Sequence, residues 1–151
     1  MGRETRRQGF TLVLLISLSL SSVKAQDLHK IYNIVRHVES NNRVHVVGDG
    51  GRAYGVVQIH NICVQDINRL YGTSYTHKQA FNKHTAKEMF ILYLKAGIRL
   101  FKRRHSRLPS ESEIVRMWNG GIYMGYRKTS TLKYLKRYLH YKSLLIKNKR
   151  E

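Results

Sequence analysis

Apolar residues recur at intervals of three and four in five stretches of this 151-residue chain, which predicts five amphipathic helices. The first begins near Asp27, a suitable N-cap, and places Glu39 at its C-terminal end. Ser110 and Glu113 have the spacing of a capping box, and Gly72 follows the second helix as a stop signal. The four later helices are expected over residues 61–70, 85–104, 111–117 and 132–139.

The stretch between the first two helices is β-prone instead. Residues 44–47 and 53–59 are rich in β-branched side chains, and the sequence Gly-Asp-Gly-Gly at 48–51 is a strong turn signal. We expect a short hairpin or an extended lobe here. The predicted fold class is therefore mainly α (α+β), a single domain of helices with a small β-hairpin region.

The first 25 residues have the pattern of a secretory signal peptide. A basic start is followed by the apolar run Phe10–Leu20 and by Val23-Lys24-Ala25, which resembles a small-x-small cleavage site. The apolar run is shorter than the roughly 20 residues that span a bilayer, so we expect no stable membrane anchor after cleavage. These features predict a signal peptide at 1–25, a folded domain at 26–145, a basic tail at 146–151, and a periplasmic or secreted location.

The chain is strongly basic, with 28 Lys and Arg residues against 9 Asp and Glu residues, a formal charge of +19. Such a surface attracts a polyanion, and charge alone does not choose among nucleic acid, anionic lipid and an anionic cell wall. Cys63 is the single cysteine, which excludes an intramolecular disulfide and a cysteine-based zinc cluster. Its apolar neighbours predict a buried, unreactive thiol. The histidines show no ligand spacing, and we expect no metal and no cofactor.

Three short segments carry the candidate chemistry. In Val38-Glu39-Ser40, a Glu at the end of an apolar helix would keep its proton through partial burial and act as a general acid. Tyr54-Gly55-Val56-Val57-Gln58 offers a close backbone approach at its Gly and an amide for a sugar substituent. Trp118-Asn119-Gly120-Gly121 offers an aromatic ring and a second amide. Taken alone, each has a plainer interpretation: a surface Glu, a polar strand residue, and a core aromatic before a helix stop.

In this order the three segments resemble the signature segments of the lysozyme-like lytic transglycosylases, of the soluble lytic murein transglycosylase type. That family more commonly has Leu-Met where this chain has Val56-Val57, and Ala-Tyr-Asn-Ala-Gly around the position of Trp118. A weaker match, Ser130 to Leu135, resembles the family's Thr-x-x-Tyr-Val segment and makes Tyr134 a candidate, although a packing tyrosine explains it equally well. The resemblance covers residues 28–139.

The resemblance implies a lysozyme-like fold, with helices around a cleft and a small β region beside it. It also implies cleavage of the β-1,4 bond between N-acetylmuramic acid and N-acetylglucosamine in peptidoglycan, leaving a 1,6-anhydromuramyl end. Glu39 would be the single general acid and base, whereas most glycosidases use two carboxylates. Substrate contacts are implied for eight further residues: Ser40, Tyr54, Gly55, Gln58, Trp118, Asn119, Gly120 and Tyr134.

Two alternatives stay open. Asp49 is most simply a turn residue, but if it faced the cleft it would position a water, and the chain would be a muramidase, which is a hydrolase. A basic nucleic-acid- or wall-binding protein without catalysis would use the Lys, Arg and Tyr residues near the C-terminus. The signal peptide and the three segments argue against nucleic acid. As partners we expect peptidoglycan glycan strands, and local wall opening within an envelope-spanning secretion, conjugation or phage assembly suits a small domain of this kind.

Overall fold

The computed structural model of the chain describes residues 27–148, so the predicted signal peptide, its cleavage site and the last three residues lie outside the described part. A first helix covers residues 27–40. The later elements, with η for a 3-10 helix, are β1 (Val47–Gly48), η1 (Asp49–Gly51), β2 (Ala53–Tyr54), β3 (Ile59–His60), α2 (Asn61–Tyr71), η2 (His77–Phe81), α3 (Lys83–His105), α4 (Glu111–Gly120), η3 (Gly125–Arg127), η4 (Thr129–Thr131) and α5 (Leu132–Lys147). Helix α5 therefore continues two residues into the segment predicted as a basic tail.

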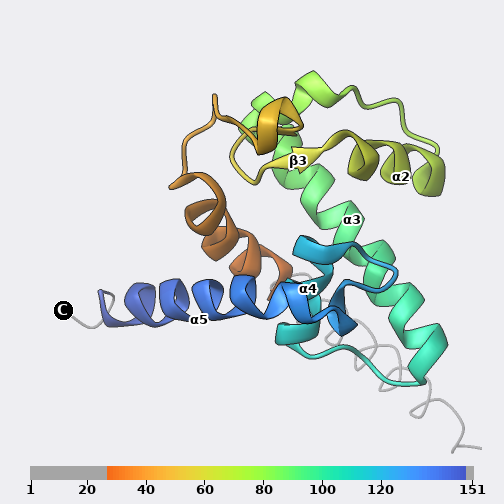
Figure 1. The fold of residues 1–151 in the computed structure, drawn as a ribbon. Coiled ribbons are helices and arrows are strands. Elements are labelled where there is room, and N and C mark those ends of the chain that lie inside the picture. Colours follow the sequence, from red (N-terminus) through yellow and green to blue (C-terminus); the bar gives the residue numbers. More distant parts are fainter. Residues whose placement is uncertain (1–26, 149–151) are drawn as a thin grey trace, which may run out of the picture.

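Helix α3 runs through the middle of the molecule and supplies much of its core (Figure 1). Its Met89, Phe90 and Leu94 side chains are fully buried. The apolar positions that predicted the first helix are buried as well: Leu28, Ile31, Ile34, Val35 and Val38. Burial of one large apolar side chain contributes ~1.5–3 kcal/mol. The first helix is therefore held firmly against the core, and Glu39 at its end is held with it.

Local end signals set several helix boundaries. The Ser110 hydroxyl accepts a hydrogen bond from the Glu113 backbone N–H, and the Glu113 carboxylate accepts one from Ser110 N–H, so the predicted capping box is confirmed. Gly72 ends α2 in the left-handed region, with φ 65°, as predicted. Helix α2 begins at Asn61, as predicted. Helix α3 begins two residues earlier than predicted because the Asn82 side chain caps it.

The β region is smaller and more folded than the sequence predicts. It is an antiparallel sheet of three two-residue strands in the order β1-β2-β3. The turn predicted at 48–51 is confirmed, and the β-prone stretch 53–59 contributes to two short strands, β2 and β3. Gly55 and Gln58 both have left-handed backbones, with φ 77° and 53°. The chain therefore turns back between them, and the stretch is divided into β2 and β3.

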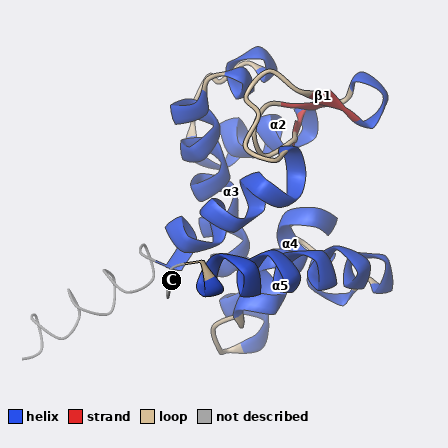
Figure 2. Ribbon diagram, turned by 90° about the vertical axis from the view of Figure 1, so that its left-hand side faces the viewer, coloured by secondary structure: helices blue, strands red, loops and turns tan. Residues whose placement is uncertain are grey.

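The two ends of α3 meet different parts of the chain. Strand β3 and α2 lie near one end, and α4 and α5 cross nearer the other (Figure 1). Figure 2 shows how short the strands are beside the helices, so the predicted class, mainly helical with a small β region, is confirmed. None of the helices within residues 27–148 is both long and apolar enough to cross a membrane.

Candidate active site

A cavity of about 460 Å³ opens where the first helix, the β region, α3 and the end of α4 meet. Its wall includes all four residues of the Trp-Asn-Gly-Gly segment, together with the Glu of the first segment. The lining residues are Glu39, Asp49, Ala53, Gln58, His60, Ile62, Cys63, Tyr93, Trp118, Asn119, Gly120 and Gly121. The three segments that lie far apart in the sequence thus each contribute to one cavity.

Glu39 occupies the helical side of this cavity and is partly buried. Its Oε1 atom accepts two hydrogen bonds, one from Trp118 Nε1 at 3.1 Å and one from the Tyr134 hydroxyl at 2.7 Å. The two donors lie 79 and 95 residues further along the chain, on α4 and α5. Both donors are neutral, so they fix the carboxyl group without adding a positive charge beside it.

The surroundings of Glu39 favour its protonated form. Burial raises the pKa of Glu39 above its ordinary value of 4.5, because desolvation disfavours the charged carboxylate. The hydrogen bonds from Tyr134 and Trp118 and the charge of Arg137 act in the opposite direction, and burial outweighs them. The pKa of Tyr134 is itself raised, first by burial and then by Glu39, so its hydroxyl stays a donor. A carboxyl group with a raised pKa and a fixed position can deliver a proton.

Trp118 belongs both to the site and to the core. Its ring centroid lies 4.5 Å from that of Phe90 and 6.0 Å from that of Tyr93, which it meets edge-on. These contacts set the direction in which Nε1 points at Glu39. At the end of α4, a Cβ added to Gly120 would come within 2.6 Å of the Thr131 side chain, so only glycine fits there.

The opposite side of the cavity comes from the β region. Gln58 lines it, while its Nε2 atom donates to the backbone oxygens of Gly55 at 2.9 Å and Val46 at 3.3 Å. These two hydrogen bonds hold the amide group in place through its nitrogen. The side-chain oxygen of Gln58 takes part in neither of them. Asn119, on the helical side, is exposed and also lines the cavity. Two amides therefore face the space beside Glu39.

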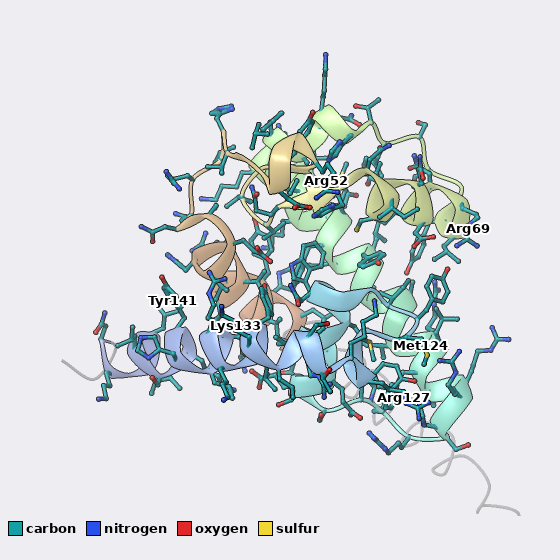
Figure 3. All side chains as sticks on the ribbon, viewed as in Figure 1. Arg52, Arg69, Met124, Arg127, Lys133 and Tyr141 are labelled. Atoms are coloured by element: carbon teal, nitrogen blue, oxygen red, sulfur yellow. The ribbon has the colours of Figure 1, made fainter. Side chains whose placement is uncertain are left out.

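Asp49 lines the same cavity and is a turn residue as well, with φ 48°. Its Oδ1 atom lies 2.9 Å from Arg52 Nη2, and its Oδ2 atom lies 3.5 Å from His60 Nε2. The Asp49 side chain is 47% exposed. Figure 3 shows Arg52 next to β3. The second carboxylate is thus present, but it is more open to solvent than Glu39 and is held by a cation.

Four residues with implied substrate contacts do not line the cavity: Ser40, Tyr54, Gly55 and Tyr134, of which Tyr134 contacts Glu39. Ser40 is 3% exposed, and its hydroxyl donates to Val56 O at 2.8 Å, which joins the first helix to the β region. Tyr54 stacks on His77, with ring centroids 3.8 Å apart. A Cβ on Gly55 would lie 1.9 Å from Ala80 O, so the backbone of Gly55 packs closely against η2. Ser40, Tyr54 and Gly55 contact other parts of the fold, and their implied contacts with substrate stay predictions.

Several cavity residues were not predicted. His60, Ile62 and Tyr93 line the cavity, and Ile62 is 63% exposed there. Arg137 donates to Val38 O at 2.6 Å, next to Glu39. Helical spacing offered a signal for Arg137, because it follows Tyr134 by three residues and so lies on the same side of α5. Ile62 and Tyr93 carry no such signal, since their positions depend on how α2 and α3 pack.

Cys63 is buried, as predicted, and burial raises the pKa of its thiol. Such a thiol is a poor nucleophile. Among residues 27–148, no three His, Cys, Asp or Glu side chains are grouped as metal ligands would be.

Comparisons of the chain with protein-family models, with curated proteins and with solved structures give no match. The function is therefore inferred from the residues of the cavity and their contacts.

Proposed function

We propose that this chain is a peptidoglycan lytic transglycosylase with a lysozyme-like arrangement of helices and a small β region around its cleft. It would cleave the β-1,4 bond between N-acetylmuramic acid and N-acetylglucosamine. The observation that carries the proposal is the Glu39 carboxyl group, partly buried in a cavity and bonded by Trp118 and Tyr134. These three residues come from the segments that resemble the family's signature, and they meet at one oxygen atom.

In the proposed reaction, Glu39 first donates its proton to the oxygen that leaves as the C1–O4 bond breaks. The raised pKa of Glu39 supports this role, because a general acid must hold its proton near the working pH. The resulting carboxylate then takes the proton of the muramyl C6 hydroxyl while that oxygen forms a bond to C1. The product is a 1,6-anhydromuramyl end, Glu39 regains its proton, and no water is consumed. The substrate's own N-acetyl group assists at C1.

The other cavity residues suit a glycan substrate. The amides of Gln58 and Asn119 offer hydrogen bonds to N-acetyl and hydroxyl groups, and the exposed part of Trp118 offers a ring face. The formal charge of +19 matches an anionic wall polymer. A periplasmic or secreted location, and local wall opening for a secretion, conjugation or phage assembly, belong to the same proposal. Recovery of no envelope-assembly component with the tagged protein would contradict the last point.

A muramidase is the second candidate, because Asp49 lines the same cavity as Glu39. In that reaction Asp49 would position or activate a water, and the product would have a reducing muramyl end. The 47% exposure of the Asp49 side chain and the ion pair of its Oδ1 atom with Arg52 favour the first candidate, since Asp49 is more open to solvent than Glu39.

Digestion of purified peptidoglycan sacculi by residues 26–151 tests the proposal, with the products read by mass spectrometry. Glu39→Gln keeps an acceptor oxygen for Trp118 and Tyr134 and removes the acid. Glu88→Gln, at an exposed position on α3, is the matched control. Anhydromuropeptides are expected from the wild type and from Glu88→Gln, and none from Glu39→Gln. Reducing muramyl ends would establish the hydrolase instead, and glycan binding without any product would refute both enzymes.

A further inference from the structure

Helix α5 carries a line of exposed apolar side chains. Leu132, Leu139 and Ile146 are 43%, 47% and 45% exposed. They are spaced seven residues apart, so they lie within ~40° of one line along the helix. We call these three residues the α5 apolar line. Large apolar side chains arranged in this way on a surface indicate a contact with something apolar.

Basic side chains border the α5 apolar line. On a helix, Lys136 and Lys147 lie within ~80° of the line on one side, and Lys142 lies within ~80° on the other. Lys142 pairs with Glu111 at 2.6 Å. Residues 114–150 hold ten Lys or Arg residues and no Asp or Glu. The surface along α5 is therefore apolar in the middle and positive along the edge that carries Lys136 and Lys147, while Glu111 neutralises Lys142 on the other edge.

The α5 apolar line faces away from the cavity. Arg137 donates to Val38 O, next to Glu39, and so marks the side of α5 that meets the first helix. At about 100° per residue, Leu139 lies ~200° around the helix from Arg137. Helix α5 lies along one edge of the molecule, and Tyr141 extends from the side of α5 that faces the first helix (Figures 1 and 3).

We propose that α5 docks the protein on an anionic lipid surface, with the α5 apolar line entering the headgroup region and Lys136 and Lys147 contacting lipid phosphates. The cavity then faces away from the bilayer. This inference goes beyond the proposed reaction and does not depend on it, because none of the residues involved lines the cavity.

Other occupants fit the same surface less well. Nucleic acids and anionic wall polymers would meet the lysines, but they gain little from exposed Leu and Ile side chains. A second copy of the chain would bring two α5 helices together, and the basic borders of both would repel each other. An anionic bilayer complements both the apolar line and the positive edge formed by Lys136 and Lys147.

Vesicle co-sedimentation tests the proposal, with phosphatidylcholine vesicles compared with vesicles of phosphatidylcholine and phosphatidylglycerol in equal parts. The whole chain and residues 26–151 are both used, because the apolar run at 10–20 can bind lipid itself. Leu139→Gln with Ile146→Gln removes most of the line, and Val47→Gln with Leu108→Gln is the matched control at exposed apolar positions elsewhere. Lys136→Gln with Lys147→Gln tests the charge, against Lys102→Gln with Arg103→Gln on α3.

We expect binding to the anionic vesicles only, and an affinity about tenfold lower for the two α5 variants, given the burial of two apolar side chains and the attraction of each Lys. Both control variants should bind within about threefold of the wild type, since surface changes elsewhere have small effects. Equal binding by the wild type and the α5 variants would overturn the proposal. So would a dimer that Leu139→Gln with Ile146→Gln dissociates, or binding to DNA but not to anionic vesicles.

Discussion

Two carboxylates face one cavity from opposite sides, and their surroundings differ. Glu39 comes from the helical side, where burial raises its pKa and two neutral donors, Trp118 and Tyr134, share one of its oxygens. Asp49 comes from the β side, where its side chain is 47% exposed and contacts Arg52 and His60. The surroundings of Glu39 thus favour the protonated carboxyl group, whereas Asp49 lies beside the cationic side chain of Arg52.

The difference teaches that the environment, more than the presence of a carboxylate, assigns a catalytic role. A general acid needs desolvation, and the burial of Glu39 outweighs both its two hydrogen bonds and the charge of Arg137. A carboxylate that must attack or activate water needs a free oxygen, and one of the two oxygens of Asp49 is paired with Arg52. This difference supports the proposal of a reaction that uses one carboxylate, and the changes below test each side of the cavity in turn.

The largest effect is expected for Glu39→Gln. General acid–base catalysis contributes about 10²–10⁴-fold, and Glu39 performs both proton transfers in the proposed reaction, so the rate of anhydromuropeptide release should fall by about 10³-fold or more. Initial rates on sacculi, measured beside Glu88→Gln, check this. A rate within tenfold of the wild type would remove Glu39 from the reaction.

The same variant should be more stable than the wild type at neutral pH. The pKa of Glu39 in the folded chain lies above its ordinary value of 4.5. The folded state is therefore stabilised relative to the unfolded chain below this pH, and part of that stability is lost as the pH rises from 4.5 through the raised pKa. Glu39→Gln removes the loss, which is ~1.4 kcal/mol for each unit of the shift. Urea unfolding at pH 4 and pH 7 measures it, and a variant less stable at pH 7 contradicts the burial argument.

Gly55→Ala should disturb the β side of the cavity by destabilising the fold. The added Cβ would lie 1.9 Å from Ala80 O, and φ is 77°. Overpacking of this kind costs about 1–3 kcal/mol, and the left-handed backbone adds about 1 kcal/mol for a residue with a Cβ. Gly50→Ala is the matched control, because it has φ 62° and nothing within 4 Å of its Cβ. Equal losses for both variants in urea unfolding would show that the contact with η2 does not matter.

The helices of this fold could be predicted because their signals are local. The spacing of apolar residues and the caps at Ser110 and Gly72 act within one or two turns of the chain. The split of residues 53–59 into two strands could not be predicted, since it depends on a left-handed backbone at Gln58, which has a Cβ. That conformation is held by the tertiary bonds of its side chain to Val46 and Gly55.

The candidate site shows the same division. Motif order brought Glu39, Trp118 and Tyr134 to attention, and their hydrogen bonds lie where three helices meet. The sequence could not show that the Ser40 hydroxyl donates its hydrogen bond to Val56 O, because only the folded chain brings these two residues together. Residue type suggests a chemical capacity, and only packing decides whether the group faces the cavity or the core.

Tyr134→Phe should weaken the helical side without removing its acid. The Tyr134 hydroxyl donates to Glu39 at 2.7 Å, and this bond lowers the pKa of Glu39. Its loss should raise that pKa further, so the decline of activity at alkaline pH should move to higher pH. We expect a rate about tenfold lower at the optimum, the equivalent of one hydrogen bond of ~1 kcal/mol or slightly more. Tyr141→Phe, whose hydroxyl makes no hydrogen bond within the described residues, is the control; a pH profile that moves to lower pH would contradict the assignment.

Asp49→Asn should have the smallest effect and decides between the two candidate reactions. Asn tolerates the left-handed backbone at this position, where φ is 48°, and keeps one oxygen for Arg52. In a transglycosylase the rate should change by less than about threefold, as for other surface changes, and the products should keep their anhydro ends. In a muramidase the same substitution removes the group that prepares the water, and the rate should fall about 10²-fold or more. Because Asn preserves the turn, a large loss with Asp49→Asn would mean that the β-side carboxylate takes part in the chemistry and that the contacts with Arg52 and His60 position it for that role.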